Sequence, residues 1–114
     1  MGIWNIVNVK NKTPGKRYAH NLVYKKPYLV VIGGNLENNV TNDVWVLDIQ
    51  NKPLIWSQIK FAGEAPQPRD YHSASLCTFG SASGMIVLFG GRSAKREPIN
   101  DCWGLVKHVS SGEW

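Results

Sequence analysis

The sequence predicts an all-β fold built from two copies of one four-stranded antiparallel unit. Landmark residues recur in the same order in the two halves of the 114-residue chain, which is the signature of a repeat architecture. Short runs rich in Val, Ile, Leu and aromatic residues alternate with turns rich in Gly, Pro, Asn and Lys, as in all-β proteins. No stretch shows the sustained periodicity of an amphipathic helix.

The repeat keeps its landmarks at nearly constant spacing. Matched residues lie 52 positions apart at the start of the unit and 58 apart at its end. The extra residues fall in "TFGSASG" (78–84), a turn where insertion costs little. In order, the matched landmarks are Arg17 and Arg69, His20 and His72, Gly33-Gly34 and Gly90-Gly91, Asp43 and Asp101, Trp45 and Trp103, and Trp56 and Trp114.

Each unit divides into short strands separated by polar turns. The first unit, 17–61, is expected to hold strands at 20–24, 28–34, 43–49 and 54–61. The second unit, 69–114, repeats the first three at 72–79, 85–91 and 101–106, with only the start of a fourth strand at Trp114. Residues 3–9 read as the outer strand of a preceding unit.

Four antiparallel strands in about fifty residues is the period of a β-propeller blade. An Arg-x-x-His start, a double glycine closing the second strand, an Asn-Asp-x-Trp third strand and a fourth-strand Trp resemble kelch repeats. "GEAPQPRDYHSAS", "GGRSAKREPIND" and "WGLVKH" further resemble the propeller of kelch-repeat Ser/Thr protein phosphatases of plants and apicomplexan parasites. The resemblance implies a kelch-propeller fragment of about two blades, lying ahead of a metal-dependent phosphatase domain.

The landmarks are expected to support the fold, because an active site seldom repeats with its frame. The arginines and histidines should bond between blades or to the next turn, and the glycines should adopt positive φ. Tryptophans, including Trp4, should pack between neighbouring blades. The residues given this structural role are Arg17, His20, Gly33, Gly34, Asp43, Trp45, Trp56, Arg69, His72, Gly90, Gly91, Asp101 and Trp103.

Several function classes lack support in the sequence. Net charge is +5, but the basic residues are scattered and form no nucleic-acid-binding stripe. No apolar run reaches the length of a membrane span, and no signal-peptide layout is present, so a cytoplasmic or alternatively nuclear location is expected. Cys77 and Cys102 form no CxxC pair, and their strands place them roughly 9–10 Å apart, so reduced thiols are expected.

No catalytic constellation is found. The chain has no nucleophile elbow, no Gly-Asp dipeptide and no Gly-Asn-His-Glu motif, so the two-metal machinery of the resembled phosphatases is absent. We therefore predict no enzyme activity and no cofactor in this chain. Two divalent metals, such as manganese, are implied only for a phosphatase domain outside it.

Two blades do not close a propeller ring. The surplus strand at 3–9 and the missing last strand of the second unit match. We hypothesise that copies join head to tail and that three copies form a six-bladed ring with heterologous contacts.

Binding is expected on the blade end that carries the longer loops. The loops between second and third strands share that end with the connections between blades, and arginines there suit carboxylate or phosphate groups. The predicted partner is an acidic or phosphorylated protein segment, and the alternative is a rim of merely solvated charges. The candidate residues are Lys16, Arg17, Arg69, Arg92, Lys95 and Arg96.

The favoured function is a protein-interaction module for regulation or substrate choice in a Ser/Thr phosphatase. The alternatives are a kelch adaptor or actin-binding propeller unrelated to a phosphatase, or a propeller oxidase or sugar-binding domain. A test for bound copper would identify the oxidase, because such enzymes need Tyr, His and Cys ligands that meet near the axis.

Overall fold

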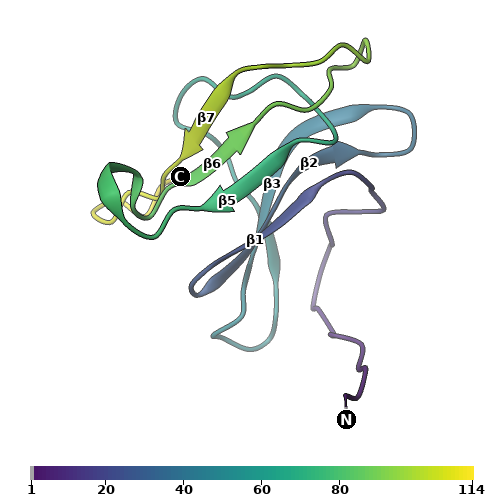
Figure 1. The fold of residues 1–114 in the computed structure, drawn as a ribbon. Coiled ribbons are helices and arrows are strands. Elements are labelled where there is room, and N and C mark those ends of the chain that lie inside the picture. Colours follow the sequence, from purple (N-terminus) through teal and green to yellow (C-terminus); the bar gives the residue numbers. More distant parts are fainter. Residues whose placement is uncertain (1) are drawn as a thin grey trace.

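The structure of the chain, a computed structural model, describes residues 2–114 and contains two antiparallel sheets (Figure 1). Blade 1 consists of β1 (Asn21–Lys25), β2 (Tyr28–Asn35), β3 (Val40–Asp48) and β4 (Trp56–Gln58), paired in that order. Blade 2 consists of β5 (Ser73–Leu76), β6 (Ile86–Phe89) and β7 (Cys102–Leu105). The prediction of an all-β fold with repeated antiparallel units is confirmed.

Both blades use the same strand register. Val31 of β2 lies opposite Trp45 of β3, and their counterparts Leu88 and Trp103 lie opposite each other in blade 2. Within residues 2–114, the one regular element besides the strands is the 3-10 turn η1 (Gly80–Ala82), which falls in the segment where the repeat spacing grows. The sequence repeat is therefore a structural repeat, residue by residue.

The strand bounds differ from the predicted ones in the outer part of each blade. β3 begins earlier than predicted, at Val40, and the predicted fourth strand at 54–61 is reduced to the three residues of β4. Ile59 still donates its N–H to the Val44 carbonyl at 2.9 Å. An outermost strand has a partner on one side only, so fewer ladder bonds hold it.

The predicted strand at 3–9 is not formed in this structure. Residues 2–9 have no strand assignment, and Trp4 is 100% exposed. The expectation that Trp4 packs between blades is therefore wrong for this chain. The physical reason is that a strand needs a ladder partner, and the segment extends away from both sheets (Figure 1).

The core lies between the two blades. Alternate residues of β1, β2 and β3 point toward blade 2, because side chains of a strand alternate between its faces. Burying each large aliphatic side chain contributes about 1.5–3 kcal/mol, so this layer is the main support of the fold. Its buried members are Val23, Val30, Ile32, Val44 and Val46 of blade 1, with Ile86 and Leu88 of blade 2.

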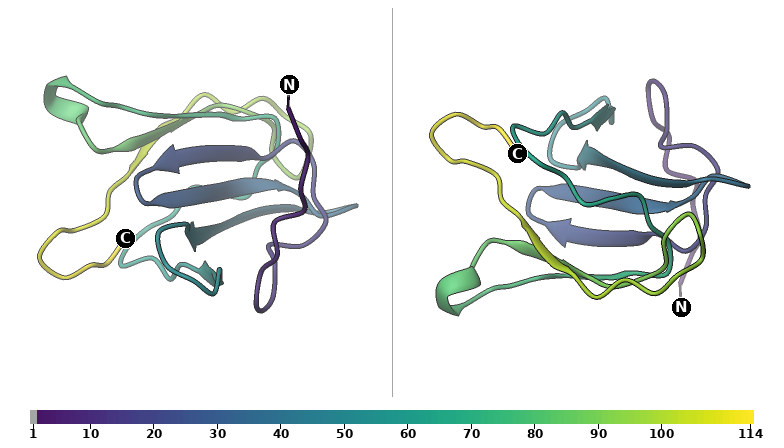
Figure 2. Two further views of the ribbon diagram at one scale, coloured as in Figure 1. Left: turned by 90° about the horizontal axis from the view of Figure 1, so that it is seen from below. Right: turned by 90° about the horizontal axis from the view of Figure 1, so that it is seen from above.

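The two blades sit side by side with their first strands adjacent, and Figure 2 shows blade 2 lying along one side of blade 1. The β2–β3 and β6–β7 loops reach the same end of the sheets, and the β1–β2 and β5–β6 turns occupy the other end (Figure 1). No helix in the described part of the chain is long and apolar enough to cross a membrane.

Candidate protein-interaction site

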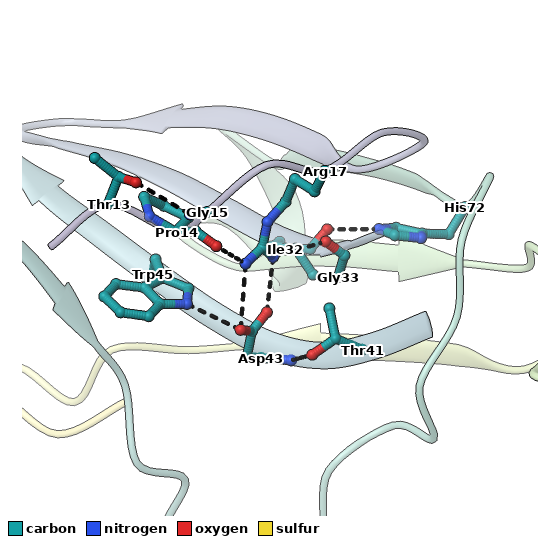
Figure 3. A network of polar contacts seen from close by, with 10 residues as sticks. All are labelled: Thr13, Pro14, Gly15, Arg17, Ile32, Gly33, Thr41, Asp43, Trp45 and His72. Carbon is teal, nitrogen blue, oxygen red and sulfur yellow. Dashed lines mark hydrogen bonds and ion pairs between the residues drawn. The ribbon is translucent and has the colours of Figure 1, made fainter. Parts of the chain in front are cut away.

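Each blade contains the same buried arginine–aspartate pair. Arg17 Nη1 donates to Asp43 Oδ1 at 2.8 Å and to the Gly33 carbonyl at 3.0 Å, and Nη2 donates to the Pro14 carbonyl (Figure 3). In blade 2, Arg69 Nη1 donates to Asp101 Oδ1 at 2.6 Å and to the Gly90 carbonyl at 2.9 Å. The pair ties the start of a blade to its second and third strands.

A tryptophan completes the pair in both blades. Trp45 Nε1 donates to Asp43 Oδ2 at 2.9 Å, and Trp103 Nε1 donates to Asp101 Oδ2 at 2.8 Å. Burial pushes the pKa of Asp43 up, but hydrogen bonds from Arg17 and Trp45 outweigh it and hold the pKa below its ordinary value. The hydrogen bonds from Arg69 lower the pKa of Asp101 to about 2. Both carboxylates are thus ionised at neutral pH.

These contacts remove Arg17 and Arg69 from the predicted partner-binding set. Their side chains are only 4% and 2% exposed, and each guanidinium faces an aspartate of its own blade. A buried ion pair loses several kcal/mol when one partner is taken away, so neither arginine is free to leave its pair for another protein.

The two landmark histidines lie in different surroundings. His72 is buried, and its Nε2 donates to the Ile32 carbonyl of blade 1 at 2.9 Å, across the interface between the blades (Figure 3). His20, its counterpart, is exposed. The histidine therefore bonds between blades, whereas the arginine bonds within one.

Acidification is expected to destabilise the chain first through His72. Burial lowers the pKa of His72 below the ordinary 6.5, so the unfolded chain takes up a proton at a higher pH than the folded chain does. The free energy of unfolding should therefore be constant above about pH 7 and fall as the pH drops through 6.5 toward the lowered pKa. Asp43, Asp70 and Asp101 have lowered pKa values, so their contributions are lost only at lower pH, below the ordinary 3.8.

Urea unfolding midpoints measured between about pH 7.5 and pH 5 check this expectation. His72→Gln keeps an N–H donor for the Ile32 carbonyl and should flatten the pH dependence. Burial, and then the charge of Arg17, also lower the pKa of His20. A His20→Gln variant therefore measures the part of the pH dependence that comes from His20. An unchanged dependence in His72→Gln would contradict the assignment.

The remaining candidate residues lie on one end of the blades, which we call the loop face. It consists of the β2–β3 turn (36–39), the β6–β7 loop (90–101) and the connections 10–17 and 62–68. Lys16, Lys95 and Arg96 are exposed on it. Arg92 is one-third exposed and pairs with the buried Asp70 through two bonds of 3.0 Å.

A polar network behind Arg92 was missed by sequence reasoning. Asn35 of blade 1 donates from Nδ2 to Asp70 Oδ2 at 3.1 Å, so Asp70 joins the two blades and also orients Arg92. Arg92 additionally lies 4.8 Å from the centre of the Tyr71 ring. The counterpart of Asp70 in the first unit is Tyr18. Because the two residues differ, a comparison of repeated landmarks does not reveal this network.

A small polar cavity opens between the blades on the loop face. Its volume is about 110 Å³, and both the β2–β3 turn and the β6–β7 loop contribute to its wall. The charged side chains that line it are Glu37, Asp70, Arg92 and Arg96. The cavity brings Arg92 and Arg96 together at the junction of the blades, whereas Lys16 and Lys95 are outside its wall.

The other landmarks occupy structural positions. Trp103 packs on the core between the blades, and Trp45 and Trp56 are half-buried. Cys77 and Cys102 are free thiols in the structure. Residues 2–114 contain no cluster of three or more His, Cys, Asp or Glu side chains arranged to hold a metal ion.

Comparison with known proteins decides the family. Residues 2–114 match the model of the KLHDC2/KLHL20/DRC7 Kelch-repeats domain. The chain belongs to the kelch-repeat family. Kelch repeats form protein-interaction modules that are not themselves catalytic, so the predictions of family and of general role are confirmed.

Curated relatives carry the kelch region within much longer proteins. Serine/threonine-protein phosphatase BSL2 of Arabidopsis thaliana is 38% identical over 97% of this kelch chain. Rho GTPase-activating protein gacHH of Dictyostelium discoideum is 34% identical over 82% of it, and Adagio-like protein 3 of Oryza sativa subsp. japonica is 36% identical over 77%. The chain spans 10%, 6% and 13% of the lengths of these relatives, respectively.

Proposed function

We propose that this kelch segment docks an acidic or phosphorylated protein segment on its loop face. The observation that carries the proposal is the position of Arg92 and Arg96 in the wall of the cavity between the blades. Lys16 and Lys95 add positive charge around it. Glu37 also lines the cavity and would favour a segment whose acidic group lies beside the arginines.

The two arginines would act differently. Arg92 is held by Asp70 and by the face of Tyr71, so it presents its exposed third in a fixed position and loses little conformational entropy on binding. Arg96 forms no ion pair with a carboxylate in residues 2–114, so its guanidinium can take a carboxylate or phosphate in bidentate geometry.

For the longer protein, we propose a Ser/Thr protein phosphatase in which this segment regulates activity or selects substrates. The support is the match of BSL2 over nearly the whole chain. The two divalent metals of such an enzyme would belong to a catalytic domain outside residues 1–114. The proposed compartment is the cytoplasm, with the nucleus as the alternative.

We also propose that copies of the chain associate head to tail, and that three copies form a six-bladed ring. The support is the difference in strand number, because blade 2 has three strands where blade 1 has four. The edge of β7 is therefore available for a strand from another chain.

Docking is tested by replacing Lys16, Lys95 and Arg96 together with alanine, which leaves the ion pair of Arg92 with the buried Asp70 in place. We expect at least a tenfold loss of affinity for a fluorescent peptide of alternating Glu and phosphoserine, because charge-assisted hydrogen bonds contribute about 1.5–3 kcal/mol each. Fluorescence anisotropy at several salt concentrations measures the loss, and the wild-type affinity should fall as salt rises.

The matched control replaces Lys26, Lys52 and Lys60 with alanine. These three lysines are exposed and lie outside the loop face, and their removal lowers the net charge by the same three units. The control should bind nearly as well as the wild type. Equal losses in both variants would mean that the peptide responds only to overall charge, and an unchanged affinity in the loop-face variant would remove the proposal.

A further inference from the structure

Thr13 belongs to a short sequence feature that the repeat does not require. It is the one Ser or Thr of the chain that is followed directly by proline, and a lysine lies three positions after it, in "TPGK" (13–16). The corresponding segment of the second unit reads "APQP" (65–68), which keeps the first proline but has neither the hydroxyl nor the lysine. The repeat therefore accounts for Pro14, but not for Thr13 or Lys16.

The Thr13 hydroxyl is accessible in the structure. Thr13 is exposed and has no strand assignment. Its Oγ1 accepts a hydrogen bond from the Gly15 N–H at 3.2 Å (Figure 3), a bond that leaves the proton of the hydroxyl unused. The proline that follows biases Thr13 toward extended backbone, which is the conformation in which protein kinases bind their substrates.

This accessibility does not depend on a neighbouring blade being absent. Blade 1 packs ahead of the counterpart segment 62–68 in the same chain, and five of the seven residues of that segment are nevertheless exposed. Ala65, the counterpart of Thr13, is half-buried. A connection between blades thus stays at the surface when a blade lies on each side of it.

The charges around Thr13 suit a phosphate. Lys12 and Lys16 are exposed on either side of it, and Arg17 donates from Nη2 to the neighbouring Pro14 carbonyl (Figure 3). Asp43 neutralises the Arg17 guanidinium, so the two lysines supply most of the positive charge. A phosphate on Oγ1 carries a charge of about −1.5 to −2 and can pair with them.

We propose that a proline-directed protein kinase phosphorylates Thr13 and that the phosphate weakens docking on the loop face. The kinase would select the segment through Pro14, which has no N–H to be satisfied, and through Lys16, whose charge suits an acidic subsite. Thr13 Oγ1 forms a bond to the γ-phosphorus of ATP held by the kinase, and the bond from that phosphorus to the β–γ bridging oxygen breaks. ADP leaves with the electron pair, and the hydroxyl proton passes to the catalytic aspartate of the kinase.

The effect on docking rests on the proposed function of the loop face. Lys16 is one of the residues that would attract an acidic segment there, and the phosphate would pair with it instead. The phosphate also lowers the net charge from +5 to about +3 and repels acidic groups within a Debye length, about 10 Å at 0.1 M salt. Because Arg92 and Arg96 stay in place, we expect a partial loss of affinity, about three- to tenfold.

The modification is tested by incubating the full chain with a cyclin-dependent kinase and Mg-ATP and locating the phosphate by mass spectrometry. One phosphate per chain is expected, on Thr13, and none in Thr13→Ala. Pro14→Ala keeps both the Thr13 hydroxyl and the carbonyl that Arg17 contacts, and it should slow the reaction by roughly tenfold or more. An unmodified Thr13, or an equal rate in Pro14→Ala, would overturn the assignment of the site.

The effect on docking is measured by fluorescence anisotropy, with the peptide of alternating Glu and phosphoserine and the chain before and after phosphorylation. The loss of affinity should shrink as the salt concentration rises. Thr13→Ala treated with the same kinase should bind like the untreated wild type. Lys26→Glu is the charge-matched control: it also lowers the net charge by two, but Lys26 is exposed outside the loop face, so the affinity should change less than about twofold.

The outcomes separate this proposal from the docking function beneath it. A phosphorylated chain that binds the peptide as tightly as the unmodified chain, or no more weakly than Lys26→Glu, would overturn the regulation and leave docking standing. An unmodified chain that does not bind the peptide would overturn docking together with its regulation. In that case the mass spectrum still decides whether Thr13 is the phosphorylation site.

Discussion

Asp101→Ala is expected to lower the free energy of unfolding by about 3–5 kcal/mol, the usual cost of leaving one member of a buried ion pair unpartnered. The Arg69 side chain is 2% exposed, so most of its guanidinium stays out of water when the carboxylate is lost. The Trp103 N–H loses its acceptor as well. Since small domains are stable by about 5–15 kcal/mol, the variant should be close to unfolding. Urea titration followed by tryptophan fluorescence gives the change.

Arg69→Ala should cost less than Asp101→Ala, because the Asp101 side chain that remains is 38% exposed and can be solvated. Asp48→Ala is the control. It removes a carboxylate that accepts bonds from Gln50 and Asn51 at the surface, and it should leave the unfolding midpoint nearly unchanged. A larger loss in Arg69→Ala than in Asp101→Ala would contradict the explanation by burial.

Gly34→Ala is expected to destabilise the chain by about 3–5 kcal/mol, from backbone strain and overpacking together. Gly34 has φ 105°, and a Cβ there would lie 2.7 Å from His20 Cβ and 2.9 Å from the Tyr18 carbonyl oxygen. The Gly34 N–H also donates to the Arg69 carbonyl of blade 2, so any shift that relieves the clash weakens the contact between blades. Thermal or urea unfolding measures the loss.

Gly15→Ala separates the two contributions. Gly15 has a similar φ of 88°, but nothing lies within 4 Å of the position of a Cβ. This control should show the strain alone, about 1–2 kcal/mol. Equal losses at the two positions would mean that close packing at the double glycine contributes nothing to stability.

The sequence was sufficient to predict the blades and their order, because the landmarks recur with the fold. It was not sufficient to predict which landmarks touch. Arg69 and Asp101 are both recognisable as repeated landmarks, yet the sequence also predicts Arg69 in the partner-binding set, since an arginine beside a polar connection is usually exposed. The pairing depends on strands folding back on each other, and spacing along the chain does not report it.

The predicted strand at 3–9 and the network of Asp70 and Asn35 show the same limit of sequence-based prediction. Residues 3–9 are predicted from the repeat to form an outer strand, but strand formation requires a neighbouring sheet, and Trp4 is fully exposed in this chain. Asp70 and Asn35 were missed because their network occurs once and is built from residues that differ between the units. Unrepeated features can be found only in the folded chain.

The ion pairs of Arg17 and Arg69 are each formed with an aspartate of the same blade. In the β6–β7 loop, only Gly90 and Asp101 contact Arg69. Within the tip at 93–96, Ser93 Oγ accepts from the Lys95 and Glu97 N–H groups and Arg96 has φ 62°, so Ala94 and Lys95 are the positions that can change at the least cost to folding. Mutation is free to explore new binding partners there while the tryptophans, glycines and ion pairs beneath stay fixed, and an engineer could graft foreign loops onto the same position.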